Sequence, residues 1–474
     1  MDYDVLILGG GIIGCAIAYE LSKYNLNIAV IEKDYDICND TPSINTATIY
    51  DGLECEDELS SKLIRKGNLL MEEYASRFKV PYKRCGTLYI ARNEFQAKSI
   101  DKMYERAKAK KIDDVKLLIG KEILEYEPNI EGNIIKSIYI PNTGVISSYD
   151  LALAYGEIAF DNGVNFRLQE EVESINSINK GFKIKTSKNK FTCKIVIDTT
   201  KDKNLQLVNE NNKEDGKGKY LKYVVIDKSY EKLYSNIVFD VRENERIYIR
   251  PTINNEIIGA YSSYKNVPYD KVIEKIKPLT KEISENDIKV VRDWRLFDEP
   301  VNIQDDIINS GYINIKVNHY AKVTITPYLA LNISKLVIEK LNCKFKKDFN
   351  DKRREYFRFK NLSNEERNKI IRLDSKYGRI ICQCEKVSEG EIVDSIRRPL
   401  GARTVTGVKR RTGAGFGSCD GCYCKDKIIE ILAREMDKRV TEVVNNSKDS
   451  TILLSRIKEF DEMWGNKKWR IRIY

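Results

Sequence analysis

Five cysteines crowd the C-terminal part of the chain at spacings that suit metal binding. Two close groups of thiols that meet in a compact module could supply four thiolates to one centre. The C-x-C gap of the first group is shorter than the gap common in structural zinc sites, and glycines before the second group would leave backbone N–H groups for cluster sulfurs. The spacing therefore favours an iron–sulfur centre, with zinc or unliganded core cysteines as the alternatives. The candidate ligands are Cys382, Cys384, Cys419, Cys422 and Cys424.

The N-terminal residues carry a second pattern with chemical meaning, in which an apolar run, three glycines, a helical run and another apolar run end in Glu32. This order predicts a strand–turn–helix–strand unit that binds a dinucleotide, with its phosphates at the helix N-terminus. Gly9 would permit the tight turn, Gly11 the approach of a pyrophosphate and Gly14 close helix–strand packing. Glu32 would accept hydrogen bonds from a ribose, and an acid with only Lys33 beside it favours FAD or NAD over NADP. The predicted cofactor-binding residues are Gly9, Gly11, Ile12, Ile13, Gly14, Glu32 and Lys33.

The composition restricts the classes of function. The chain has 474 residues and a net charge of +10, from 81 basic and 71 acidic residues that are spread along it. This mixture indicates a solvated surface, so we expect no nucleic-acid partner. No apolar run is long enough to span a membrane and no secretory signal is visible, which predicts a cytoplasmic protein with at most peripheral membrane contact. The only histidine is His319, which excludes a metal site built from several histidines.

The elements that must position these residues follow from hydrophobic periodicity and alternation. Periodicity predicts helices over residues 56–78, 94–110, 148–162, 327–341 and 388–397. Alternation predicts strands over residues 86–91, 182–185, 193–198 and 312–317. Residues 219–300 are expected to form an antiparallel sheet that provides the floor of a substrate site. A glycine-punctuated basic loop is expected over residues 407–418.

The C-terminal segment resembles a known module. It is similar to the bacterioferritin-associated-ferredoxin-like 2Fe-2S module that ends the large subunit of anaerobic glycerol-3-phosphate dehydrogenases and their relatives. In those relatives the last two ligands form a C-x4-C arrangement, which maps to Cys419 and Cys424, whereas stand-alone ferredoxins of this type use C-x2-C, which maps to Cys419 and Cys422. The sequence satisfies both, so the fourth ligand stays open. The matching residues are Cys382–Glu385, Gly390–Ile392, Arg398–Thr404, Val408–Thr412, Cys419 and Cys424.

The rest of the chain resembles the D-amino-acid-oxidase-like superfamily of flavoenzymes. The resemblance implies FAD at the N-terminal motif and oxidation of a small alcohol or amine by hydride transfer to the flavin, with electrons leaving through the 2Fe-2S centre. It also implies a small-molecule substrate, either a phosphorylated alcohol or an amino or hydroxy acid, and partner redox subunits. Besides the nucleotide motif, the matching residues are Lys66–Asn68, Gly86–Leu88, Pro141–Ile146, Asn162–Val164 and Arg250–Thr252.

Three departures from that family pattern fall on the predicted flavin-facing wall. Tyr50 stands where the family usually has a histidine base, and a phenol with a pKa near 10 is a poor base at neutral pH, so Asp51 could act instead. The second flavin-contacting turn reads Asp198–Lys201 and lacks its usual glycine, and the third, Asn318–Thr324, has no glycine either. Such losses impair close backbone approach to a cofactor. They allow a changed substrate, or a flavin domain that persists only as a scaffold.

Two arginines and the histidine complete the candidate catalytic set. Arg250 and Arg295 stand at positions similar to those where relatives hold a substrate's phosphate or carboxylate, a task that suits a bidentate guanidinium. His319 is either a structural residue or a proton donor beside the flavin. The candidate catalytic residues are thus Tyr50, Asp51, Arg250, Arg295 and His319.

These observations predict an α/β protein with a Rossmann-like FAD-binding domain, an antiparallel-sheet substrate domain and a small helical C-terminal iron–sulfur module. The FAD-dependent region would cover residues 1–345, with nucleotide-binding parts at about 1–80, 145–205 and 305–345 and substrate-domain parts at about 81–144 and 206–304. A charged linker over 346–377, a 2Fe-2S domain over 378–436 and a tail over 437–474 would follow. The predicted function is a flavin-dependent dehydrogenase; the alternative is a non-catalytic electron-transfer or scaffold subunit.

Overall fold

The computed structural model describes residues 1–39, 47–200, 218–227, 234–254, 256–280 and 283–455. The chain divides into two compact units. The first unit consists of Met1–Ile31 and Cys38–Arg353, and the second consists of Glu32–Ile37 together with the chain from Arg354 onward. The C-terminal end of the predicted tail, residues 456–474, lies outside the described residues. The predicted domain boundaries stay predictions.

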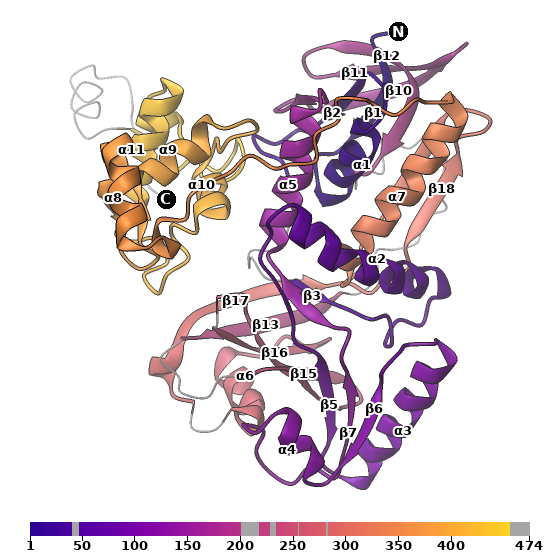
Figure 1. The fold of residues 1–474 in the computed structure, drawn as a ribbon, viewed down its shortest axis with the longest axis vertical. Helices are drawn as coiled ribbons and strands as arrows, with labels where there is room; N and C mark the ends of the chain where they lie inside the picture. The colour runs from indigo at the N-terminus through magenta and orange to yellow at the C-terminus, as the bar shows by residue number, and fades with distance from the viewer. Residues whose placement is uncertain (40–46, 201–217, 228–233, 255, 281–282, 456–474) are drawn as a thin grey trace, which may run out of the picture. The chain divides into compact units, whose positions relative to one another are not determined.

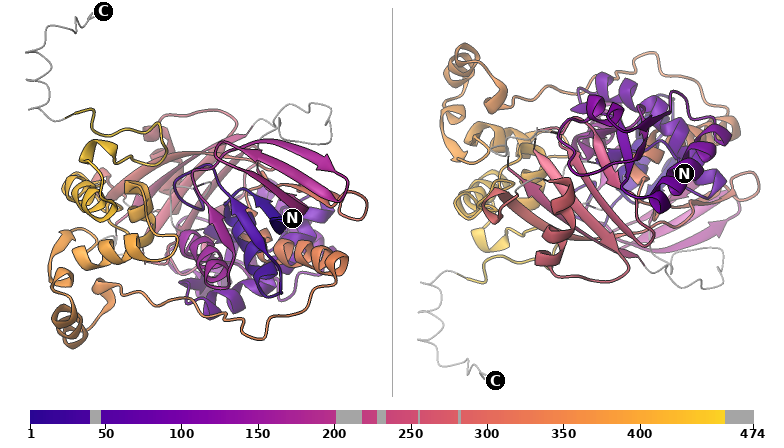
Figure 2. Two further views of the ribbon diagram at one scale, coloured as in Figure 1. Left: turned by 90° about the horizontal axis from the view of Figure 1, so that it is seen from above. Right: turned by 90° about the horizontal axis from the view of Figure 1, so that it is seen from below.

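The first unit is built around a mixed sheet of eight strands whose centre is the N-terminal strand β1 (Tyr3–Leu8). β1 pairs in parallel with β2 (Ile28–Ile31) and with β12 (Lys190–Asp198), and all three are almost fully buried where they meet. Near-continuous apolar strands of this kind are typical of a parallel sheet that is covered on both faces. The remaining strands of this sheet are β9 (Asn165–Arg167), β10 (Val172–Ile178), β11 (Gly181–Thr186), β18 (Asn302–Asp306) and β19 (Tyr312–Lys316). Figure 2 shows the indigo N-terminal strands beside the magenta strands of this sheet.

Helices cover this sheet and bring distant parts of the chain together. α1 (Ile12–Ser22) is buried along its whole length and packs against α5 (Ser148–Asp161) and α7 (Lys322–Leu341), as Figure 1 shows. α2 (Glu58–Arg77) packs against α7 at Gly67, where a Cβ atom would lie 1.9 Å from the carbonyl oxygen of Thr324. Only glycine allows this approach, which explains the glycine in the Lys66–Asn68 motif.

A second sheet of eight strands forms the other half of the first unit. Its order is β17-β13-β16-β15-β14-β5-β7-β6, and every neighbouring pair is antiparallel except β14 with β5. The antiparallel sheet expected over residues 219–300 is therefore confirmed. Its strands are β5 (Thr87–Ala91), β6 (Lys116–Ile119), β7 (Lys136–Ile140), β13 (Lys219–Ile226), β14 (Ile237–Asp240), β15 (Glu245–Pro251), β16 (Ile257–Ser263) and β17 (Ile288–Leu296).

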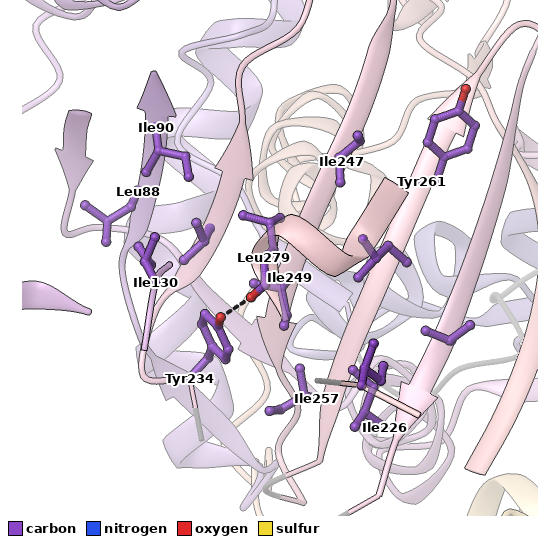
Figure 3. Close-up of a cluster of buried hydrophobic side chains, with 14 of the residues drawn as sticks. Leu88, Ile90, Ile130, Ile226, Tyr234, Ile247, Ile249, Ile257, Tyr261 and Leu279 are labelled. Carbon is purple, nitrogen blue, oxygen red and sulfur yellow. Dashed lines mark hydrogen bonds between the residues drawn. The ribbon is translucent and has the colours of Figure 1, made fainter. Parts of the chain in front are cut away.

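The two faces of this second sheet differ in chemistry. One face carries an apolar core that includes Ile247, Ile249 and Tyr261, with α6 (Tyr269–Ile276) and Leu279 packed on it. Figure 3 shows this core and the hydrogen bond from the Tyr234 hydroxyl to the Leu279 carbonyl. Because side chains alternate along a strand, the residues between these on β15 face the other way. That opposite face carries the candidate site.

The first unit also contains a small sheet and further helices. The small sheet has the order β3-β8-β4 and joins Ala47–Ile49 and Tyr82–Arg84 to the central Gly144–Ile146. The helices are α3 (Glu94–Ala109) and α4 (Glu122–Tyr126), and short 3-10 helices cover Lys277–Leu279 and Glu285–Asp287. The helices expected over 56–78, 94–110 and 148–162 are confirmed as α2, α3 and α5.

The second unit is a small helical module with its own apolar core, centred on Ile392, Val408 and Leu432. A buried ion pair between Asp36 and Arg411 joins its short N-terminal stretch to the rest of the unit. Its regular elements are α8 (Asn364–Leu373), β20 (Ile380–Cys382), β21 (Val387–Ser388), α9 (Glu389–Arg397), α10 (Val405–Thr412) and α11 (Lys425–Met436), with 3-10 helices at Phe359–Asn361, Ser375–Gly378 and Val440–Glu442. The helix expected over 388–397 is confirmed as α9.

Two local expectations are wrong. The first half of the basic loop expected over 407–418 is α10, because Thr404 caps the helix through Gly407 N–H at 2.9 Å and Gly413 ends it with a φ of +86°. α7 begins at Lys322 rather than at Pro327, and this proline lies inside the helix, where it has no N–H for an intrahelical bond. Within the described ranges, no helix combines the length and apolarity that crossing a bilayer requires.

Candidate functional site

The glycine turn after β1 has the geometry that a nucleotide cradle needs. Gly9 adopts a φ of +96°, which side-chain-bearing residues rarely adopt, and a Cβ on Gly14 would lie 2.0 Å from the Gly9 carbonyl oxygen. The turn is therefore tight, and α1 packs closely on it. Gly11 is the N-cap of α1 and supplies no side-chain hydrogen bond. The first N–H groups of the helix, at Ile12, Ile13 and Gly14, are thus not capped by a side chain and fit a phosphate.

The acid predicted to bind a ribose follows this sheet directly. Glu32 and Lys33 come immediately after Ile31, the last residue of β2. Glu32 Oε1 accepts a hydrogen bond of 2.9 Å from the Asp34 backbone N–H, which fixes the direction of its side chain. A carboxylate at the carboxyl end of a parallel strand is where a ribose acceptor belongs in this fold.

The second flavin-contacting turn packs on the glycine turn through a threonine. Thr199 Oγ1 donates to the Leu8 carbonyl at 2.9 Å and lies 2.8 Å from where a Cβ of Gly9 would be. Asp198, at the end of β12, accepts hydrogen bonds from Thr200 and from the Tyr312 hydroxyl. These contacts brace the end of β1. Lys201, which stands where the resemblance expects a glycine, lies outside the described residues.

The polar face of the second sheet carries two arginines, Arg246 and Arg250, which lie on the same face of β15. Arg250 is buried and donates through Nη1 to Thr48 Oγ1 at 3.0 Å. Arg246 forms an ion pair with Glu54 at 3.3 Å and lies over the ring of Tyr320, 5.3 Å from its centroid. The burial of Arg246 lowers its pKa, but Glu54 and the tyrosines around the guanidinium together outweigh this effect and raise the pKa overall. A guanidinium held in this way stays charged.

Arg246 is a site residue that the sequence reasoning missed. The signal was present in the strand itself, because residues 246, 248 and 250 share one face of any strand in which 247 and 249 are core. Tyr248 lies between the two arginines on this face and contacts Phe239 on the neighbouring strand, with ring centroids 4.9 Å apart.

Arg295 does not join this face. It pairs with Tyr220 across β17 and β13, and Tyr220 lies on the same face of β13 as Val224, which belongs to the apolar core beneath α6. The Arg295 guanidinium lies over the Tyr220 ring at 3.5 Å and donates to the Gly218 carbonyl at 2.9 Å. The structure therefore places Arg295 on the opposite side of the sheet from Arg250, and exposed to solvent.

Tyr50 and Asp51 follow β3 and differ sharply in acidity. The Tyr50 ring lies edge-on to Tyr320 at 4.8 Å, and its backbone is held by Thr324 and Asn68. Burial raises the pKa of Tyr50 far above its usual value, which makes the phenol a poor base. Burial also raises the pKa of Asp51, to about 6. Asp51 Oδ1 accepts from the Leu53 N–H at 3.0 Å, whereas Oδ2 is buried with no hydrogen-bond partner among the described residues.

His319 has both ring nitrogens engaged. Nδ1 accepts from the Ala321 N–H at 3.0 Å, so the proton of the neutral ring is on Nε2. Nε2 lies 3.3 Å from Asp298 Oδ1 and 3.7 Å from the Cys55 thiol, and the ring stacks on Tyr320 at 4.3 Å. Burial lowers the pKa of His319. The imidazole is therefore neutral at pH 7 and fixes the position of Tyr320.

The C-terminal cysteines form two pairs in the second unit. The Cys384 and Cys419 sulfurs lie 3.6 Å apart, and the Cys382 and Cys424 side chains are hydrogen-bonded to each other. Cys422 is exposed and belongs to neither pair, whereas Cys424 is buried. Among the described residues, no three potential ligands surround a single point as one metal ion would require. Two thiol pairs fit a two-iron cluster, in which each iron takes two thiolates, better than one tetrahedral zinc ion.

Backbone N–H groups converge on these sulfurs. Cys382 accepts from Gly415 and Glu385, and Cys419 accepts from Gly421 and Tyr423. The hydrogen bond from Cys424 is the largest of the effects that hold the pKa of Cys382 at about 6. Gly417 packs so closely that a Cβ there would lie 2.2 Å from the Cys384 Cβ. Glycine-rich turns around cysteines thus give N–H donors that stabilise thiolate and sulfide charge.

Comparison with known proteins agrees with this geometry. Residues 4–302 match the family described as FAD dependent oxidoreductase. The chain belongs to this family. A glycerol 3-phosphate dehydrogenase from Caloramator mitchellensis is 33% identical over 95% of this chain and 98% of its own length. An L-2-hydroxyglutarate dehydrogenase from Dictyostelium discoideum is 34% identical over 32% of this chain and 35% of its own length.

The remaining comparisons concern the C-terminal module and the fold. Residues 380–434 of this FAD-dependent oxidoreductase match the BFD-like [2Fe-2S] binding domain. The dithionite-reduced L-alpha-glycerophosphate oxidase from Mycoplasma pneumoniae, with FAD bound, superposes with a TM-score of 0.65 at 21% identity, over 75% of this chain and 99% of that one. The predicted fold class, the flavin-dependent dehydrogenase class and the two cofactors, FAD and a 2Fe-2S cluster, are confirmed.

Proposed function

We propose that this oxidoreductase dehydrogenates a small phosphorylated alcohol, with glycerol 3-phosphate as the first candidate, and that its C-terminal module passes the electrons on to partner redox subunits. The bound FAD would supply the hydride acceptor and the 2Fe-2S cluster a one-electron carrier. The substrate candidate comes from the glycerol 3-phosphate dehydrogenase that matches nearly the whole chain.

The observation that carries an alcohol dehydrogenation is the buried carboxyl of Asp51. Oxidation of an alcohol requires a base for the hydroxyl proton, and the pKa of an effective base lies near the working pH. Asp51 has a pKa of about 6 and a buried oxygen, Oδ2, without a partner among the described residues. We assign the base to Asp51 and leave to Tyr50 a packing role against Tyr320.

The anion of the substrate would be held by the arginines of β15. Arg250 and Arg246 lie on the same face of the strand, and the phenol of Tyr50 lies within electrostatic range of both. Guanidinium groups suit a dianionic phosphate because they stay charged and donate in a fork. His319 is assigned a positioning role, since its two nitrogens already hold Ala321 and Asp298.

In the cluster module we assign the four ligands to Cys382, Cys384, Cys419 and Cys424. Both thiol pairs consist of these residues, whereas Cys422 is exposed and belongs to neither pair. The cofactor-binding roles of Gly9, Gly11, Ile12, Ile13, Gly14, Glu32 and Lys33 likewise stay a proposal, supported by the uncapped helix and the tight turn.

A second candidate function is a scaffold subunit that has lost flavin chemistry. The aromatic residues on the predicted flavin side favour it, because Tyr50, Tyr320 and His319 pack on one another where the family usually has a histidine and glycines. Anaerobic purification separates the two candidates. The dehydrogenase would release FAD on denaturation, and its flavin absorbance would bleach on addition of glycerol 3-phosphate but not of an amino acid. Protein that carries iron yet releases no flavin would contradict the dehydrogenase.

A further inference from the structure

We propose that Glu54 determines substrate specificity by accepting a hydrogen bond from a second hydroxyl group of the substrate, while Arg246 beside it holds the anionic group. The substrate class is then a three-carbon polyol monophosphate rather than an amino or hydroxy acid. This inference rests on the proposed dehydrogenase function and names a residue pair that the predicted catalytic set does not contain.

One carboxylate oxygen of Glu54 accepts no hydrogen bond from the described residues. Its Oε2 atom is buried and has no hydrogen-bond partner among the described residues. The ion pair with Arg246 Nη2 at 3.3 Å brings a charge close but does not supply an aligned N–H. A buried carboxylate oxygen without a donor lowers stability, so a donor from a ligand is the expected complement.

Asp51 repeats this feature on the same loop. Its Oδ2 atom is also buried without a partner among the described residues, and the charges of Asp51 and Glu54 act on one another. Both carboxylates also act on Tyr89, whose ring is on the floor of the site and stacks on Phe239 at 4.9 Å. The loop thus has two buried acceptor oxygens whose carboxylates, like the Arg246 guanidinium, act on Tyr89.

This set of groups is complementary to a particular class of molecule. A polyol phosphate carries an anionic group and hydroxyl donors on separate carbons, so one hydroxyl reaches Asp51 and another reaches Glu54. The reacting hydroxyl gives its proton to Asp51, and the second hydroxyl keeps its proton and donates it to Glu54. A simple hydroxy acid offers a single hydroxyl, and a simple amino acid carries its donors on one nitrogen, so neither places donors on two separate carbons as a polyol phosphate does. Sites built to bind a hydroxyl reject analogues that lack it, because their polar groups are then left unpaired.

The experiment compares glycerol 3-phosphate with 2-hydroxypropyl phosphate, which keeps the phosphate and the secondary hydroxyl but lacks the terminal hydroxyl. For the holoenzyme we expect kcat/KM to favour glycerol 3-phosphate by about 100-fold or more. In Glu54→Ala this preference falls to within about tenfold, mainly through slower turnover of glycerol 3-phosphate. Glu54→Gln keeps part of the preference, because its amide oxygen still accepts a hydrogen bond.

A matched control is available on β15, the strand that carries Arg246. Glu245 precedes Arg246 but faces the apolar core, where it binds Lys275 and Tyr261. Glu245→Ala should leave the preference unchanged. Inorganic phosphate should inhibit Glu54→Ala as well as it inhibits the unmodified enzyme, because Arg246 and Arg250, which would hold the anion, are unchanged in this variant. Retained FAD content shows that the variant is folded. An unchanged preference in Glu54→Ala, or an equal loss of both substrates, would overturn the inference.

A different experimental result would show that the proposed function is wrong. If the unmodified enzyme oxidises neither compound, the dehydrogenase assignment fails, and calorimetric titration of both phosphates into the holoprotein then tests Glu54 by binding alone. Tighter binding of glycerol 3-phosphate that is lost in Glu54→Ala supports the inference. Equal affinities, or no binding of either compound, overturn it.

Discussion

The cysteine module and the arginine-bearing wall of the second sheet are assembled in opposite ways. The paired sulfurs of Cys384 and Cys419 come from residues 35 positions apart within one small module. The hydrogen bond between Arg250 and Thr48 joins residues 202 positions apart, and the contact between Cys55 and His319 spans 264. One site is made by short turns, whereas the other depends on the pairing of whole strands and on loops that meet across the unit.

Because of this difference, we expect substitutions to have different effects in the two regions. In the module, a ligand is fixed by glycine turns next to it, so a substitution acts locally on the cluster. On the wall, Asp51, Glu54 and Arg246 hold their positions through elements far from them in sequence, and a substitution acts on charge and proton affinity. We therefore expect all-or-none losses in the module and graded changes on the wall.

The largest expected effect separates Cys424 from Cys422. Cys424→Ser should lose most of the iron and the visible cluster bands, because it removes one of four thiolates, while Cys422→Ser should keep about two irons per chain. Iron analysis and absorption spectra of anaerobically purified protein measure both. The flavin content serves as the control and should be equal in the two variants. Loss of the cluster in Cys422→Ser alone would reverse the assignment of the fourth ligand.

The same contrast shows how much could be predicted from the sequence. The glycine turn and the cysteine groups could be predicted because spacing along the chain fixes their geometry, as the φ of +96° at Gly9 and the contact between Cys384 and Cys419 illustrate. The strand pattern also predicted the antiparallel sheet over residues 219–300. These are local features, in which the residue type and its neighbours decide the conformation.

The proposed site on the polar face of the second sheet could be predicted only in part. Arg250 and Arg295 both lie in strands, but strand pairing places them on opposite faces of the sheet, and the Arg295 segment alone does not show this. Glu54 could not be predicted, because no neighbouring residue in the sequence indicates a role for it and its partner Arg246 lies on a strand that only the fold brings near. The capping residue Thr404 was a local signal for α10 that the glycines around it obscured.

A second prediction tests the wall through its proposed base. Asp51→Asn should lower kcat by about 10²–10⁴-fold, as loss of a general base does. In the unmodified enzyme kcat/KM should rise as the pH increases through about 6, because the carboxyl must be ionised to accept a proton. That rise should be absent from the residual activity of Asp51→Asn. A retained rise would assign the base to another residue, and a similar kcat loss in Tyr50→Phe would point to the phenol.

The third prediction uses the two arginines as a matched pair. Arg250→Ala should raise KM by about 10–100-fold, the usual effect of losing a hydrogen bond to a charged group, and Arg295→Ala should change it by less than about twofold. Steady-state kinetics with glycerol 3-phosphate measure both. If Arg295→Ala had the larger effect, the substrate would bind on the other face of the sheet, and the contrast between the two faces would fail.

The smallest expected effect is on stability and has the opposite sign from the loss of activity. A carboxyl whose pKa is about 6 in the folded protein and about 3.9 in the unfolded chain binds its proton more tightly when folded. Its contribution therefore favours folding at low pH and is lost as the pH rises through about 6. Asp51→Asn removes this ionisation, so it should be more stable than the unmodified protein by on the order of 1–3 kcal/mol at pH 7.5 and equally stable near pH 4. Urea unfolding at the two pH values, with exposed Asp113→Asn as the control, measures the difference. An equal gain at both pH values would mean that packing, not the buried charge, separates the variant from the native protein.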